Sequence, residues 1–76
     1  MVFNRIKSFL VNIYHRDESL ILPDTDIRAM FKEDPEIGAL ELFVDAEDAF
    51  GFIMSDADMR EIRTIGDLVR YIEERI

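Results

Sequence analysis

Few residues in this sequence are of the types that perform covalent chemistry on a substrate. His15 is the only histidine, and Ser8, Ser19 and Ser55 are not spaced from it in a way that indicates a Ser-His-Asp arrangement. The absence of cysteine excludes thiolate catalysis, disulfides and cysteine-based zinc sites. A lone histidine without a second ligand nearby in sequence is a poor metal site, so we expect no bound metal.

The carboxylates offer a second kind of chemistry. Asp45, Glu47 and Asp48 lie close together in the sequence and could form the paired carboxylates of a hydrolase. A domain this small provides little cleft in which burial could raise a carboxylate pKa, so we interpret these acids as surface charge. Asp56-Ala57-Asp58 lacks the glycine and terminal glutamate of a calcium loop. We therefore expect a protein that is not an enzyme and that has no cofactor.

Length and charge limit the classes of partner. The chain has 76 residues, which suits a single domain over residues 1–76. Its 17 acidic and 9 basic side chains give a formal net charge of −8, which argues against binding to nucleic acid or to an anionic membrane surface. No apolar run approaches the roughly 18 residues of a transmembrane helix. We expect a cytoplasmic protein whose partner is basic.

The stretch Asp34–Phe50 carries the signals of a long helix at both ends. Asp34 can cap free backbone amides, and Pro35 suits the first helical position. Glu36 places a negative charge at the positive end of the helix dipole. Gly51 can adopt the left-handed geometry that often ends a helix. These signals predict one helix over the whole stretch.

This helix has two apolar faces, although a helix in a small bundle needs only one. The core-facing stripe comprises Ala39, Leu42, Phe43, Ala46, Ala49 and Phe50. The second face comprises Ile37, Leu40 and Val44, surrounded by Glu41, Asp45, Glu47 and Asp48. We expect the second face to bind another protein that offers a basic patch around an apolar pocket.

The other elements follow from apolar spacing and capping signals. A helix is predicted from Val2 to about Tyr14, with Val2, Ile6, Phe9 and Ile13 at helical spacing. Residues 17–33 form a long loop, too apolar to be a free linker, with one helical turn at 27–31. Ser55 and Thr64 each precede an aspartate with the spacing of a capping box. Ser55 opens a short helix, and Thr64 opens a last helix that runs to the C-terminus. The last helix carries one apolar stripe: Ile65, Leu68, Val69, Ile72 and Ile76.

These elements predict an all-α fold of three longer helices and one short helix, with a long first loop. Aromatic side chains are expected to fill its interior and to leave no long apolar cavity. Replacement of Phe50 by alanine is accordingly expected to cost about 3–5 kcal/mol.

The sequence resembles the acyl carrier protein family. Ala49-Phe50-Gly51-Phe52-Ile53, followed by Ser55-Asp56-Ala57-Asp58, is similar to the end of the family's second helix, its hydrophobic step and its acidic short helix. Residues 62–73 are similar to the family's last helix, including the threonine cap. The resemblance covers nearly the whole chain and is strongest from Leu40 onward. It implies the family's bundle fold and a partner-recognition role for the acidic second helix.

The family carries a phosphopantetheine arm on the serine of an Asp-Ser-Leu motif at the start of the second helix. Here the attachment position falls on Glu36 when counted back from Phe50 without gaps, or on Pro35 when Asp34 is aligned with the motif's aspartate. Neither residue has a hydroxyl group. Glu18-Ser19-Leu20 imitates the motif, but Pro23 follows where a long helix would have to begin.

Three functions remain open. The one we favour is a non-enzymatic interaction module that keeps the family's docking surface, lacks the arm, and binds or regulates a partner of a fatty acid, polyketide or peptide-type assembly system. The second is a small acidic bundle that forms a homodimer through Ile37, Leu40 and Val44. The third is a genuine acyl carrier that uses an unrecognised attachment residue.

Overall fold

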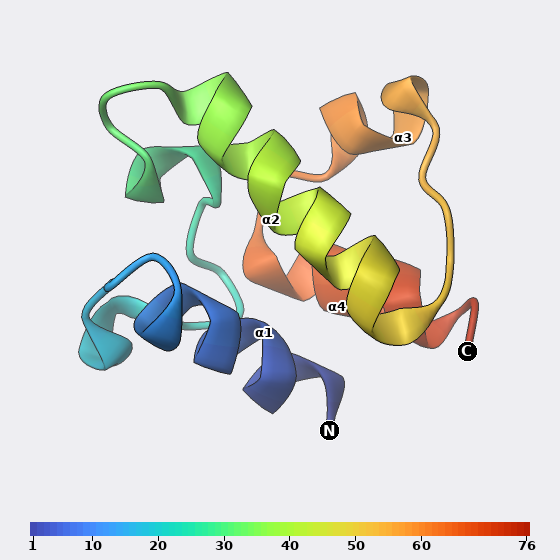
Figure 1. The fold of residues 1–76 in the computed structure, drawn as a ribbon, viewed down its shortest axis with the longest axis horizontal. Coiled ribbons are helices and arrows are strands. Elements are labelled where there is room, and N and C mark those ends of the chain that lie inside the picture. The colour runs from blue at the N-terminus through green and yellow to red at the C-terminus, as the bar shows by residue number, and fades with distance from the viewer.

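Four α-helices and two short 3-10 helices make up the protein, and the computed structural model describes all residues, 1–76 (Figure 1). In chain order they are α1 (Val2–Asn12), η1 (Glu18–Leu20), η2 (Arg28–Met30), α2 (Pro35–Phe50), α3 (Asp56–Glu61) and α4 (Ile65–Glu73). The only β geometry is an isolated bridge between Asp26 and Thr64. The predicted all-α fold is therefore confirmed. None of the helices is both long and apolar enough to cross a membrane.

The helix α2 begins and ends where the sequence predicts. The Asp34 carboxylate accepts a hydrogen bond from the Ile37 amide at 3.2 Å, and Pro35 occupies the first helical position. At the other end, Gly51 is left-handed with a φ of 73°, and its amide donates to the Glu47 carbonyl at 2.9 Å. Both ends of α2 are thus specified locally.

The caps of the two C-terminal helices are also confirmed. The Ser55 hydroxyl accepts a hydrogen bond from the Asp58 amide at the start of α3. At the start of α4, the Thr64 hydroxyl accepts from the Asp67 amide, and the Asp67 carboxylate accepts from the Thr64 amide. These bonds hold the pKa of Asp67 below its usual range, because the backbone amide favours the charged carboxylate.

Buried side chains from α1, α2 and α4 meet in one hydrophobic core, and Figure 1 shows α2 crossing the front of the molecule. Of the predicted stripe on α2, four residues are buried: Ala39, Leu42, Phe43 and Ala46. The core receives a further row from α1, namely Val2, Ile6 and Leu10, and another from α4, namely Ile65, Leu68 and Ile72.

Six apolar side chains that the sequence places on core-facing stripes lie at the edge of the core or outside it: Phe9, Ile13, Ala49, Phe50, Val69 and Ile76. Because α1 ends at Asn12, Ile13 lies beyond the last turn and is 53% exposed. Because α4 ends at Glu73, Ile76 is also exposed. Phe50 is half-buried, with the guanidinium carbon of Arg5 lying 4.6 Å from the centre of its ring. The large cost expected for replacing Phe50 belongs instead to Phe43, which is fully buried.

The long connection between α1 and α2 packs across the bundle, as predicted. Ile21, Ile27 and Phe31 are buried, and η2 falls inside the helical turn predicted at 27–31, whereas η1 was not predicted. The backbone of the connection pairs with the start of α4. The Ile27 amide donates to the Arg63 carbonyl at 2.9 Å, and the Ile65 amide donates to the Thr25 carbonyl at 3.0 Å.

A glycine in the first turns of α2 allows this connection to approach. Gly38 is buried, and a Cβ atom built on it would overlap the Cβ, Cγ and Cδ1 atoms of Phe31. Glycine costs about 1 kcal/mol relative to alanine inside a helix. Here that cost is offset because the bare backbone at Gly38 makes room for the Phe31 ring.

Replacement of Gly38 by alanine is expected to lower the free energy of unfolding by about 1–3 kcal/mol, because the overpacking exceeds the gain in helix propensity. Chemical denaturation measures this change. In a Phe31→Gly background the same exchange should become neutral or stabilising, because the Cβ, Cγ and Cδ1 atoms that the new methyl group would overlap are all absent. Equal destabilisation in both backgrounds would show that the ring does not require the glycine.

Candidate docking face on α2

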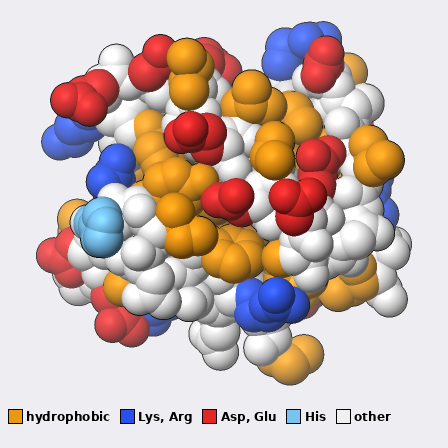
Figure 2. All heavy atoms as spheres, viewed as in Figure 1, with side chains coloured by type: hydrophobic (Ala, Val, Ile, Leu, Met, Phe, Trp, Pro, Cys, Tyr) orange, Lys and Arg blue, Asp and Glu red, His pale blue; other side chains and the backbone are white.

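One side of α2 exposes a row of apolar side chains. Ile37, Leu40 and Val44 are 56%, 47% and 41% exposed, and their spacing places them on one side of the helix. Figure 2 shows acidic side chains interspersed with apolar ones where α2 crosses the front of the molecule. We call the following set the outer face of α2: Ile37, Leu40, Glu41, Val44, Asp45, Glu47 and Asp48.

The four acids of the outer face divide into two pairs. Glu41 and Asp48 are exposed and form no hydrogen bond or ion pair within the protein. Asp45 is half-buried and accepts a 2.6 Å hydrogen bond from the Tyr14 hydroxyl. Burial and this bond to a carboxylate raise the pKa of Tyr14 well above its usual value. The carboxylate of Glu47 accepts a 2.7 Å hydrogen bond from the amide of residue 54, which ties the α2–α3 connection to α2.

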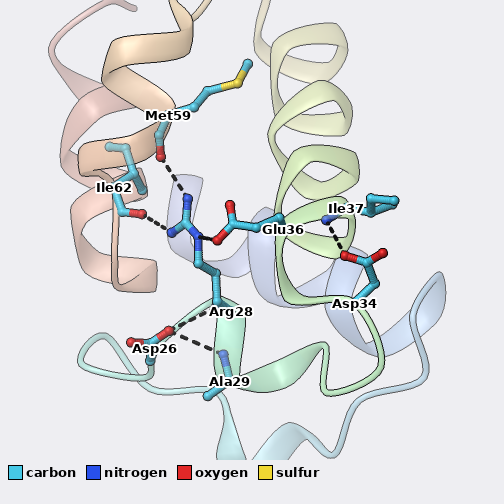
Figure 3. A network of polar contacts seen from close by, with 8 residues as sticks. All are labelled: Asp26, Arg28, Ala29, Asp34, Glu36, Ile37, Met59 and Ile62. Carbon is cyan, nitrogen blue, oxygen red and sulfur yellow. Dashed lines mark hydrogen bonds and ion pairs between the residues drawn. The ribbon is translucent and has the colours of Figure 1, made fainter.

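The first turn of α2 is joined to the end of α3 by one arginine (Figure 3). The Nε atom of Arg28 donates to the Glu36 carboxylate at 3.0 Å. Its two terminal nitrogens donate to the backbone carbonyls of Ile62 at 2.7 Å and Met59 at 3.1 Å. The Arg28 side chain is 21% exposed and the Glu36 side chain 76% exposed. The arginine therefore satisfies carbonyls that α3 leaves open, while Glu36 adds only an exposed ion pair.

No hydroxyl group lies at the start of α2, and each serine is engaged elsewhere. Ser8 on α1 accepts a hydrogen bond from Asn12. Ser19 lies in η1 and donates to Asp17 at 2.8 Å. Ser55 caps α3. The structure thus places Glu18-Ser19-Leu20 in a three-residue 3-10 helix, and not at the start of a long helix.

An open cleft of about 710 Å³ lies beside the start of α2. It reaches the outer face, because Ile37 and Glu41 belong to its lining. No histidine or serine lines it, and no group of three or more histidine or acidic side chains is placed to hold a metal ion.

Comparison with known proteins decides the family. No protein-family model matches the chain. The chain is 31% identical to the acyl carrier protein of Thermotoga maritima, over 99% of this chain and 91% of the relative. It is 37% identical to the acyl carrier protein of Aster yellows witches'-broom phytoplasma, over 95% of this chain and 93% of the relative. The same identity and coverage hold for the acyl carrier protein of Onion yellows phytoplasma.

The chain belongs to the acyl carrier protein family. This member of the family keeps all of the predicted outer-face residues on one helix.

The sequence did not identify two side chains that hold the outer face of α2 in place in this acyl-carrier-protein family member. Arg28 and Tyr14 find their partners 34 and 31 residues further along the chain, at Ile62 and Asp45. No local spacing distinguishes either residue from an ordinary surface residue. Only the fold shows that both are structural.

The two partners in the Arg28–Glu36 pair are expected to contribute unequally to stability. Arg28→Met should lower the free energy of unfolding by about 1–3 kcal/mol, because the Met59 and Ile62 carbonyls lose a charged donor. Glu36→Gln should change it by no more than about 0.5 kcal/mol, because the ion pair is exposed. Thermal denaturation of the variants measures both changes.

The matched control is Arg60→Met, because Arg60 is exposed and forms no hydrogen bond or ion pair. If Arg28→Met lowers the free energy of unfolding by no more than Arg60→Met does, Arg28 does not stabilise the fold through these contacts.

Proposed function

We propose that this protein is an acyl-carrier-protein-like interaction module without enzymatic activity, which binds or regulates a partner of a fatty acid, polyketide or peptide-type assembly system. The outer face of α2 meets that partner. The observation that carries the proposal is the exposure of Ile37, Leu40 and Val44 within a ring of acids.

The proposal also holds that the protein carries no phosphopantetheine arm. Pro35 and Glu36 occupy the two positions to which the family's attachment serine aligns, and neither can form the phosphodiester. The engagement of Ser19 and Ser55 in local caps supports this part of the proposal. The protein would therefore use the family's recognition surface without presenting cargo.

The chemistry of the outer face defines the partner's surface. Leu40 lies between the other two apolar residues in sequence, and its burial in a partner's apolar pocket supplies affinity. Glu41 and Asp48 have no internal partner, so their charges attract a basic rim and speed association. The same charges oppose pairing of the face with a second copy, because two acidic rings would meet. A basic partner therefore fits the face better than a homodimer.

Incubation with coenzyme A and a broad-specificity phosphopantetheinyl transferase is expected to leave the mass of the protein unchanged, as measured by intact mass spectrometry. The reason is the missing hydroxyl at Pro35 and Glu36. The acyl carrier protein of Thermotoga maritima serves as the positive control. A phosphopantetheine adduct on the native chain would overturn this part of the proposal and favour a carrier with an unrecognised attachment residue. Glu36→Ser alone is not expected to suffice, because Pro35 and Gly38 also depart from the family pattern.

Leu40→Arg is expected to abolish the partner complex, because it removes the apolar centre and places a charge inside the partner's pocket. Affinity purification from the cells that make the protein, followed by mass spectrometry, measures the complex. The native chain should retain an enzyme of an assembly system, and the variant should lose it. Leu22→Arg is the matched control, because Leu22 is 54% exposed and lies outside the outer face.

Charge reversal provides a second arm of the same experiment. Glu41→Lys with Asp48→Lys should slow association, and the effect should shrink as salt screens charges over about 10 Å at 0.1 M. Asp24→Lys with Glu73→Lys changes the net charge equally and should have less effect, because both residues lie away from the outer face. We leave Glu47 unchanged because its carboxylate accepts a hydrogen bond from a backbone amide.

Retention of the partner by every variant would refute the docking role. A native dimer in sedimentation that Leu40→Arg dissociates would favour self-association.

A further inference from the structure

The open cleft beside the start of α2 has a lining of its own that the docking role of α2 does not explain. It lies between the end of α1, the long connection and the first turns of α2. Its volume of about 710 Å³ is large enough for several side chains of another molecule. Because Ile37 and Glu41 line it, the cleft continues the outer face of α2 without a break.

The base of the cleft is held rigidly by aromatic and cationic side chains. The rings of Tyr14 and Phe31 meet edge to face with their centres 5.3 Å apart. Arg16 lies over Phe31 at 5.2 Å and donates hydrogen bonds of 2.6 Å to the Met30 and Tyr14 carbonyls. The guanidinium of Arg16 is therefore engaged in holding the connection.

Apolar groups remain exposed at the rim. Leu20 is 64% exposed and Ile37 is 56% exposed, and both line the cleft. Nothing else in the protein covers them. Leu22, two residues further along the same connection, is exposed to a similar degree but does not line the cleft.

The charges around the cleft favour a cation. Four carboxylates line it, from Asp17, Glu33, Asp34 and Glu41, against only two basic side chains, Arg16 and Lys32. With four acidic and two basic side chains, the lining has an excess of negative charge toward an incoming group. A basic side chain next to a bulky apolar one complements this lining in both charge and hydrophobicity.

We propose that the cleft is a second docking site for the same partner, which receives an amphipathic helical segment whose apolar face carries leucine-like residues flanked by lysine or arginine. The segment lies along the first turns of α2, with one apolar side chain between Leu20 and Ile37 and its basic neighbours near Glu33 and Glu41. This inference rests on the proposed docking function of α2 and extends the contact surface onto the long connection.

The test uses a synthetic helical peptide of leucine and lysine as the probe, and a leucine–glutamate peptide of the same length as the charge control. Fluorescence anisotropy measures affinity, and methyl shifts in NMR spectra report the site. We expect the basic peptide to shift the methyl signals of Leu20, Met30 and Ile37, and the acidic peptide to leave them unchanged.

Two pairs of matched variants decide whether the cleft contributes. Leu20→Lys should weaken binding of the basic peptide by about tenfold, whereas Leu22→Lys, with the same change of charge, should keep it within about twofold. Ala29→Trp should weaken it by filling the cleft, whereas Ala57→Trp on α3 should not, because Ala29 lines the cleft and Ala57 does not. Circular dichroism checks that each variant remains folded.

The outcomes separate this inference from the proposed function. Equal effects of Leu20→Lys and Leu22→Lys, with no effect of Ala29→Trp, would overturn the cleft as a docking site. If Leu40→Arg still weakened binding in that case, the outer face of α2 would stand alone. Loss of binding with the cleft variants but not with Leu40→Arg would overturn both the docking role of the outer face and this inference, because the cleft would then bind the peptide without the face that it is proposed to extend.

Discussion

The ring of Phe31 packs against the bare backbone of Gly38, and this contact fixes the position of the long connection on α2. The ring also forms an edge-to-face contact with Tyr14, which in turn reaches Asp45 on α2. Arg28 lies three residues before Phe31 and donates hydrogen bonds both to the first turn of α2 and to the end of α3. A connection that lacks long helices of its own is therefore held by close packing and a few directional bonds.

This arrangement divides the acids of the outer face of α2 into those that bond to other elements and those that face solvent. Asp45 and Glu47 each accept a hydrogen bond from another element, so their charges also stabilise the fold. Glu41 and Asp48 point to solvent without a partner. In a protein with a net charge of −8, these unpaired acids give the surface around the exposed apolar side chains a negative potential. The charges of Glu41 and Asp48 can therefore be changed without the loss of a hydrogen bond within the fold.

The start of α2 shows how little the fold depends on one exposed ion pair. Glu36 pairs with Arg28 at the surface. Most of the stability in this network comes from the two carbonyl contacts of Arg28, so position 36 contributes little to the fold. The fold therefore does not depend on the identity of the residue at position 36.

The sequence by itself determined the helices and their boundaries to within a few residues, because capping residues such as Asp34, Ser55 and Thr64 act on backbone groups close by in the chain. It also determined which residues of α2 form the outer face, because a helix repeats every 3.6 residues. Only the tertiary structure decided the role of Arg28 and the packing of Phe31 against Gly38. Those contacts join residues from separate elements, and neither local spacing nor hydrophobic periodicity carries information about which distant surfaces meet.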